Sequence, residues 1–189
     1  MDRRQFLGSS VVGVGAVVTG PMLRAADLQE ATPGVGPYGS IEGVAPDGNG
    51  LVLPDGFTSR VIATSDSLVA GTDYTWHVSP DGGATFATGD GDGDGWIYVS
   101  NSEAIRPRTG GASAVRFDAD GNIVDVYRSL GGATINCAGG LTPWGTWPSC
   151  EEFDWHGNSD ATEAFGTVAG RVFETDPTGE AEPILHLAM

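Results

Sequence analysis

Clusters of Asp, Gly and Pro recur along the chain between short apolar runs, and this alternation is the feature that most constrains the fold. The clearest turn signals are Pro54–Gly56, Pro80–Gly83, Asp118–Asn122 and Asp176–Gly179. Asp and Asn bond their own backbone in turns, and Gly takes the positive φ that tight turns require. No stretch of a dozen residues keeps the 3.6-residue period of a helix. The chain is therefore predicted to be all-β, with many short strands.

The apolar runs predict eight strands, and Ala112–Phe117 with Ile123–Arg128 forms the clearest hairpin among them. In this hairpin Ser113, Val115 and Phe117 are expected on one face. A single helical turn is expected at Asp160–Ala164. The other predicted strands are Thr58–Thr64, Tyr74–Ser79, Trp96–Asn101, Gly145–Glu151, Arg171–Thr175 and Pro183–Leu187.

A weak internal repeat suggests how the strands are organised. Arg116–Gly121 resembles Val172–Gly179, because in each a strand leads into an Asp/Gly turn and then another strand. The strand spacing fits a sandwich, a barrel or a propeller, and the repeat favours the propeller. At about 40–50 residues per blade the chain holds at most three to four blades, so we expect antiparallel propeller-like blades in an incomplete ring. Residues 26–50 are expected to be an irregular linker, and 51–189 the N-terminal part of the propeller domain.

The N-terminus has the pattern of an export signal over residues 1–25. The pair Arg3-Arg4 precedes the apolar run Val11–Val18, and small residues follow, as in a twin-arginine signal. The apolar run is shorter than the roughly 20 residues of a membrane-spanning helix. We expect export by the twin-arginine machinery to the periplasm or the exterior, without stable membrane insertion. An uncleaved anchor or an ordinary secretory signal are the alternatives.

The charge balance excludes some classes of partner. The chain has 25 acidic and 9 basic residues, a net charge of −16, and every basic residue is Arg. Binding to nucleic acid needs a cationic face, and so does docking on an anionic membrane. The composition suits the binding of cations instead.

An acidic run is a candidate calcium site. Asp90, Asp92 and Asp94 alternate with Gly, as in the first half of a calcium loop in which carboxylates supply oxygen ligands. The position where such a loop has its closing acid is Asn101, and Glu103 lies two residues further on. A solvated acidic turn is the alternative interpretation.

The segment from Asn136 to Glu152 is the densest in chemically useful residues. Adjacent acids such as Glu151 and Glu152 repel each other unless a cation lies between them, which suggests a metal ligand. Alternatively, one of the two faces inward to a backbone donor and the other is exposed. Cys137 and Cys150 are the only cysteines, and their spacing favours a disulfide over a thiolate ligand to iron.

Other catalytic patterns are absent from the sequence. His77, His156 and His186 are isolated and are expected to be surface or hydrogen-bonding residues. There is no G-x-S-x-G elbow, no phosphate-binding loop outside the signal and no zinc-like cysteine pattern.

Together these features match one family. The twin-arginine signal, the stretch Trp96–Glu103 and the stretch Asn136–Glu152 resemble the PhoX-like alkaline phosphatases, in particular their shorter branch. The second stretch carries the elements Cys-Ala-Gly-Gly, Thr-Pro-Trp-Gly-Thr-Trp and Cys-Glu-Glu. The resemblance extends over about residues 50–187.

The resemblance implies a β-propeller and an exported phosphomonoesterase with iron and calcium in one cluster, acting on small phosphorylated substrates. It suggests Cys137 as an iron ligand in place of the disulfide, and Glu103 with Glu151 or Glu152 as further ligands. The family's phosphatases carry His where Ser102 stands, and they draw more ligands from later blades, so the chain is expected to be an N-terminal portion. A calcium-stabilised propeller that binds a partner without catalysis is the alternative function.

Overall fold

The computed structural model describes residues 36–89, 94–106, 108–152 and 170–186. The chain divides into two compact units, whose described parts are residues 36–62 and residues from Ala63 onward. The described part of the first unit consists of turns and irregular backbone and contains no strand. The second contains strands and, within its described ranges, no helix. No helix in the described ranges has the length and apolarity to cross a membrane.

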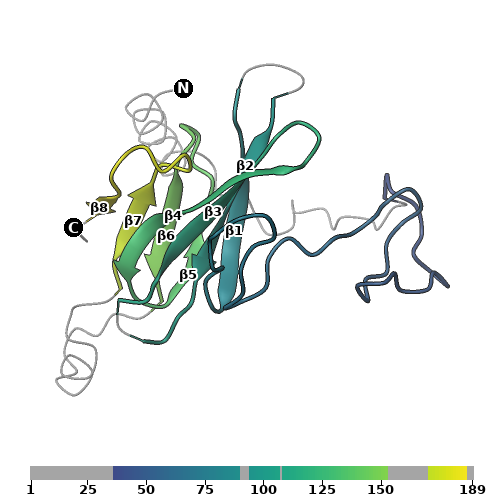
Figure 1. Cartoon of the computed structure of the whole chain (residues 1–189), viewed down its shortest axis with the longest axis horizontal. Coiled ribbons are helices and arrows are strands. Elements are labelled where there is room, and N and C mark those ends of the chain that lie inside the picture. Colours follow the sequence, from purple (N-terminus) through teal and green to yellow (C-terminus); the bar gives the residue numbers. More distant parts are fainter. Residues whose placement is uncertain (1–35, 90–93, 107, 153–169, 187–189) are drawn as a thin grey trace, which may run out of the picture. The chain divides into compact units, whose positions relative to one another are not determined.

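The first sheet contains four antiparallel strands in sequence order, namely β1 (Pro80–Ala87), β2 (Trp96–Ser102), β3 (Gly110–Phe117) and β4 (Ile123–Ala133) (Figure 1). Every residue of β3 except Arg116 is buried, whereas β1 alternates between exposed and more covered positions. Small and β-branched residues fill β3, so that both of its faces pack closely. The centre of this sheet is therefore core and its first strand is an accessible edge.

The second sheet repeats this arrangement with shorter strands, namely β5 (Asn136–Gly139), β6 (Trp147–Glu151), β7 (Val172–Thr175) and β8 (Ile184–His186) (Figure 1). Both sheets are four-stranded antiparallel meanders, as in propeller blades. The contacts between the sheets are mainly those of β5 with β1 and β2. The predicted all-β fold of propeller-like blades is confirmed, and the two described sheets do not close into a ring.

The same turn joins the third and fourth strands of each sheet. Oδ1 of Asp118 and Oδ1 of Asp176 each accept the N–H two residues further on, at 3.0 and 2.9 Å. Gly121 and Gly179 follow with φ of 78° and 73°, and their N–H groups donate back to the carbonyl of that Asp at 3.0 and 3.1 Å. The repeat seen in the sequence is therefore a structural repeat, with each copy at the same place in its blade.

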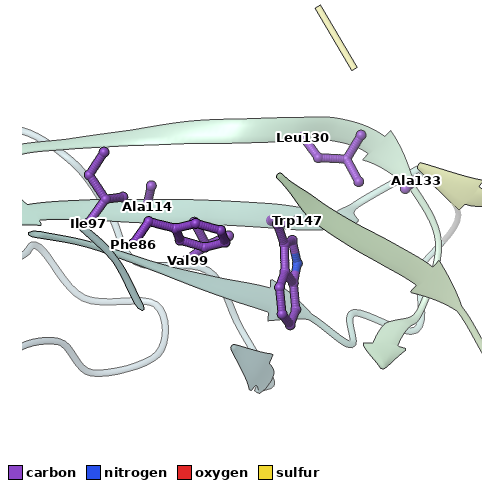
Figure 2. Packing of buried hydrophobic residues seen from close by; sticks show 8 residues of the cluster. Phe86, Ile97, Val99, Ala114, Leu130, Ala133 and Trp147 are labelled. Carbon is purple, nitrogen blue, oxygen red and sulfur yellow. The ribbon is translucent and has the colours of Figure 1, made fainter. Parts of the chain in front are cut away.

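The main hydrophobic core joins the first sheet to β6. Trp147 is the one member of this cluster from the second sheet, and it is 2% exposed. Figure 2 shows the indole of Trp147 among the buried side chains of the first sheet. Buried aromatic rings contribute strongly to packing, so Trp147 ties the two blades together. The cluster contains Phe86, Ile97, Val99, Ala112, Ala114, Leu130, Ala133 and Trp147.

Two of the predicted strands are wrong. Thr58–Thr64 forms no strand, and Tyr74–Ser79 contributes only an isolated bridge between Thr75 and Leu68. Pro80–Gly83, expected as a turn, is instead the start of β1, which forms because it pairs with β2. The short strand β5 was also not predicted. The other six predicted strands are confirmed, with ends that differ by up to five residues, and Asp160–Ala164 lies outside the described residues.

Two of the three histidines are placed, and both make polar contacts. His77 is 7% exposed, and its Nδ1 lies 2.8 Å from the hydroxyl of Ser113. Burial, and then the charge of Arg128, lower the pKa of His77 to about 4. Nε2 of His186 lies 2.8 Å from a carboxylate oxygen of Glu174. His156 lies outside the described residues.

We expect His77 to make the fold less stable at mildly acidic pH. The unfolded chain protonates this histidine near pH 6.5, whereas the folded chain does so only near pH 4. Stability is therefore full above pH 6.5 and falls as the pH drops toward 4, by about 2 kcal/mol between roughly pH 7.5 and 5. Urea unfolding at both pH values measures this loss. The variant His77→Gln cannot titrate and should lose about 2 kcal/mol less, and equal losses in both proteins would contradict the assignment.

Candidate metal centre

The two blades present a glutamate at equivalent positions. Glu103 follows β2 and Glu152 follows β6, the second strand of each sheet. The N–H of Glu103 donates to the carbonyl of Ser79, and the N–H of Glu152 to the carbonyl of Ile135, both at 2.9 Å. Ser79 and Ile135 have φ of 47° and 51°, which is unfavourable for a residue other than Gly. Such backbone strain is often found at functional sites.

The first strands bring two more side chains to the same end of the sheets. Asp81 lies two residues after Ser79, and Cys137 lies two residues after Ile135. Each falls where the pairing register shifts, between Pro80 and Gly83 in β1 and between Asn136 and Ala138 in β5. Such bulges re-aim side chains and are common next to active sites.

The first strands of the two blades also approach each other closely at this point. A Cβ on Gly82 would lie 2.6 Å from the carbonyl oxygen of Cys137. Only Gly fits at this distance, so Gly82 allows Cys137 of one blade to lie beside Asp81 of the other.

The four side chains interact electrostatically. Partial burial, then the charges of Asp81 and Glu152 and a side-chain hydrogen bond with Glu152, raise the pKa of Glu103. Burial, and then the charges of Glu152, Asp81 and Glu103, raise the pKa of the Cys137 thiol against a lowering hydrogen bond from the backbone of Ala138. We call Asp81, Glu103, Cys137 and Glu152 the acid–thiol cluster. Its members repel each other when ionised, and a bound cation would relieve this repulsion.

The donor set suits the two metals that the family resemblance implies. Carboxylate oxygens are ligands for Ca²⁺, and a thiolate beside carboxylates suits iron. Cys137 and Glu103 are half-buried, whereas Asp81 and Glu152 are exposed, so water and ions can reach the cluster. Within the described ranges no three such side chains converge closely enough to hold an ion as they stand. Metal binding would therefore draw the four side chains closer together.

Glu151 is held in a different environment from Glu152. Its side chain is fully buried and pairs with the guanidinium of Arg171, with Nε 3.2 Å from Oε2. It also accepts the backbone N–H of Thr134 at 2.9 Å and of Arg171 at 3.0 Å. This arrangement agrees with the second interpretation of the adjacent acids, in which one glutamate faces inward to backbone donors and the other is exposed.

Asp94, the one aspartate of the acidic run that the structure describes, does not join the acid–thiol cluster. Asp90 and Asp92 lie outside the described residues, and Asp94 is exposed before the first residue of β2. Glu103 follows the last residue of β2, and seven strand residues span about 24 Å. A calcium ion at Asp94 would therefore be separate from one at Glu103.

Both cysteines are free thiols in this structure. Cys150 faces Ala138 across the β5–β6 pair, beside Cys137. Burial, and then the neighbouring Cys137, raise the pKa of Cys150.

Asp81 is the cluster member that was not predicted from the sequence, because Pro80–Gly83 has the composition of a turn. Its counterpart in the second blade is Cys137, since each lies two residues after the residue with positive φ. An alignment of the sequence of one blade against that of the other would identify Asp81 as the counterpart of Cys137. The different lengths of β1 and β5 conceal this correspondence from a search at fixed spacing.

The comparisons with known proteins identify the family of the chain. The model of the family described as alkaline phosphatase PhoX matches residues 69–182, which is more than half of the chain and includes all four members of the cluster. No match was found among curated proteins or solved structures. The chain belongs to the PhoX alkaline phosphatase family.

Proposed function

We propose that the chain is an exported phosphatase, or a fragment of one, that hydrolyses small phosphate monoesters at the acid–thiol cluster, with iron and calcium as cofactors. One observation supports this most: equivalent positions of two blades bring three carboxylates and a thiol close enough to influence one another electrostatically at one end of the sheets. Repulsion between these groups does not stabilise the fold, whereas a metal centre needs anionic ligands close together and offsets their repulsion with the charge of the cation.

The proposed ligands are Cys137, Glu103 and Glu152, together with Asp81. When bound, the metal ions supply Lewis-acid chemistry, which fixes phosphate oxygens and makes a nucleophilic oxygen available at neutral pH. The carboxylates of the chain hold the cations and offset their charge. Cys137 must lose its proton to bind iron, so iron binding releases a proton and weakens as the pH falls. Glu151 is left out of this set because Arg171 and two backbone donors occupy its carboxylate.

The remaining sequence predictions complete the proposal. Residues 1–25 would direct the chain to the twin-arginine machinery and so to the periplasm or the exterior. Residues 26–50 would be a linker. Asp90, Asp92 and Asp94 would bind a separate calcium ion, and the net charge of −16 disfavours nucleic acid as a partner.

Elemental analysis of the natively exported chain, together with a phosphomonoester assay, tests the function. We expect iron, calcium and turnover. Cys137→Ser should lose iron and turnover together, because a hydroxyl is a poor substitute for a thiolate. The matched control Cys150→Ser should keep both. Calcium without iron or turnover would contradict catalysis and favour a calcium-stabilised binding module.

A further inference from the structure

A fully buried amide joins the two blades next to the acid–thiol cluster. Asn101 lies in β2, is 0% exposed, and stands two residues before Glu103. Its Nδ2 donates to the carbonyl of Ala138 at 2.9 Å. Its Oδ1 accepts the indole N–H of Trp147 at 2.9 Å and the hydroxyl of Ser149 at 2.8 Å.

These bonds fix the orientation of the amide. Oδ1 faces two donors and Nδ2 faces a carbonyl, so a flipped amide would place its N–H groups against the indole N–H. Ser149 in turn accepts the side-chain N–H of Asn136 at 2.9 Å. The network therefore links one residue of the first blade to the first two strands of the second, β5 and β6.

Each bond partner lies close in the chain to a member of the cluster. Ala138 directly follows Cys137, and Ser149 lies three residues before Glu152. With Glu103 two residues beyond Asn101, this one side chain is tied to three of the four proposed ligands. Strands are stiff over such short lengths, so the amide sets how far apart the ligands lie.

The blade repeat by itself does not require an amide at this position. In the second sheet the residue two before Glu152 is Cys150, which occupies the place of Asn101. The second strand of a blade can therefore pack with a small side chain, such as that of cysteine, at this position. We attribute the amide of Asn101 instead to its bonds across the junction between the two blades.

We propose that Asn101 is a positioning residue of the metal centre, acting through Trp147, Ser149 and the carbonyl of Ala138. This inference rests on the proposed function. Outer residues that orient metal ligands typically contribute 10–100-fold to metal affinity. We expect Asn101→Ala to weaken iron binding about tenfold or more, with a change in the thiolate-to-iron absorption band.

The experiment compares variants of the full chain by iron content, by that absorption band and by Tm. Trp147→Phe removes one donor to Asn101 while keeping an aromatic ring in the core. Trp144→Phe makes the same chemical change elsewhere, because the indole N–H of Trp144 donates to Glu174 at 2.6 Å. We expect Trp147→Phe to lower iron affinity by several-fold and Trp144→Phe to leave it unchanged, even where both lower Tm.

The outcomes separate the two levels of the proposal. Wild-type iron binding and an unaltered band in Asn101→Ala and Trp147→Phe would overturn the positioning role while leaving the metal centre in place. Should Asn101→Ala fail to fold, Trp147→Phe against Trp144→Phe still decides the question. A wild-type chain that binds no iron would overturn the proposed function, and the positioning role with it.

Discussion

Replacing Glu151 by Ala is expected to reduce the free energy of unfolding by about 3–5 kcal/mol, because the variant loses a partly buried ion pair together with two backbone hydrogen bonds. The change removes the partner of Arg171 and also the acceptor of two backbone N–H groups, those of Thr134 and Arg171. The N–H of Thr134 is buried and has no access to water as a substitute. Each buried donor left without a partner contributes about 1–3 kcal/mol to the loss. Urea unfolding of the metal-free protein measures the effect.

The neighbouring acid provides the matched control. Glu152 is exposed, so Glu152→Ala should change the stability of the metal-free protein by less than about 0.5 kcal/mol. The order of the two effects should reverse when iron content is measured. Glu152→Ala should lower the iron content, whereas folded Glu151→Gln should retain it. Equal losses of stability in the two Ala variants would contradict the division between a structural and a functional glutamate.

Gly82→Ala is expected to separate the first strands of the two blades. The added methyl would lie 2.6 Å from the carbonyl oxygen of Cys137, a backbone atom that cannot move without its strand. Overpacking of this kind typically destabilises by about 1–3 kcal/mol. Because the strand carries Cys137, we also expect iron affinity to fall about tenfold, as for other changes that misplace a ligand.

Gly140→Ala is the control for this substitution. Gly140 follows β5 directly, and a Cβ there meets nothing within 4 Å. Its stability and iron content should remain close to those of the wild type. A Gly82→Ala protein with wild-type iron affinity would show that the spacing of β1 and β5 does not control the centre.

Features with a local cause were predictable from the sequence. The β3–β4 hairpin forms where predicted because Asp118 bonds its own turn and Gly121 supplies the positive φ. The same chemistry at Asp176 and Gly179 gave the repeat that favoured the propeller. Neither turn depends on distant residues, so their sequences were sufficient.

Features with a distant cause were not predictable. β1 begins with Pro, Asp and two Gly, a turn-like composition, and is a strand only because β2 pairs with it. Thr58–Thr64 contains an apolar run but crosses the boundary between the two units, and it has no partner strand among the described residues. Pairing across the chain overrides local propensity in sheets.

The sequence by itself determined the all-β class, the repeated blade turn and the family, and it pointed to Glu103, Cys137 and one of the pair Glu151 and Glu152 as ligands. Only the tertiary structure decided that Asp81 joins them and that Glu152, not Glu151, faces the cluster. Adjacent strand residues point to opposite faces, and which face is buried depends on what packs against the strand. Glu151 is buried because it pairs with Arg171, twenty residues away. Asp81 lies in the cluster because Gly82 lets β1 approach Cys137 closely.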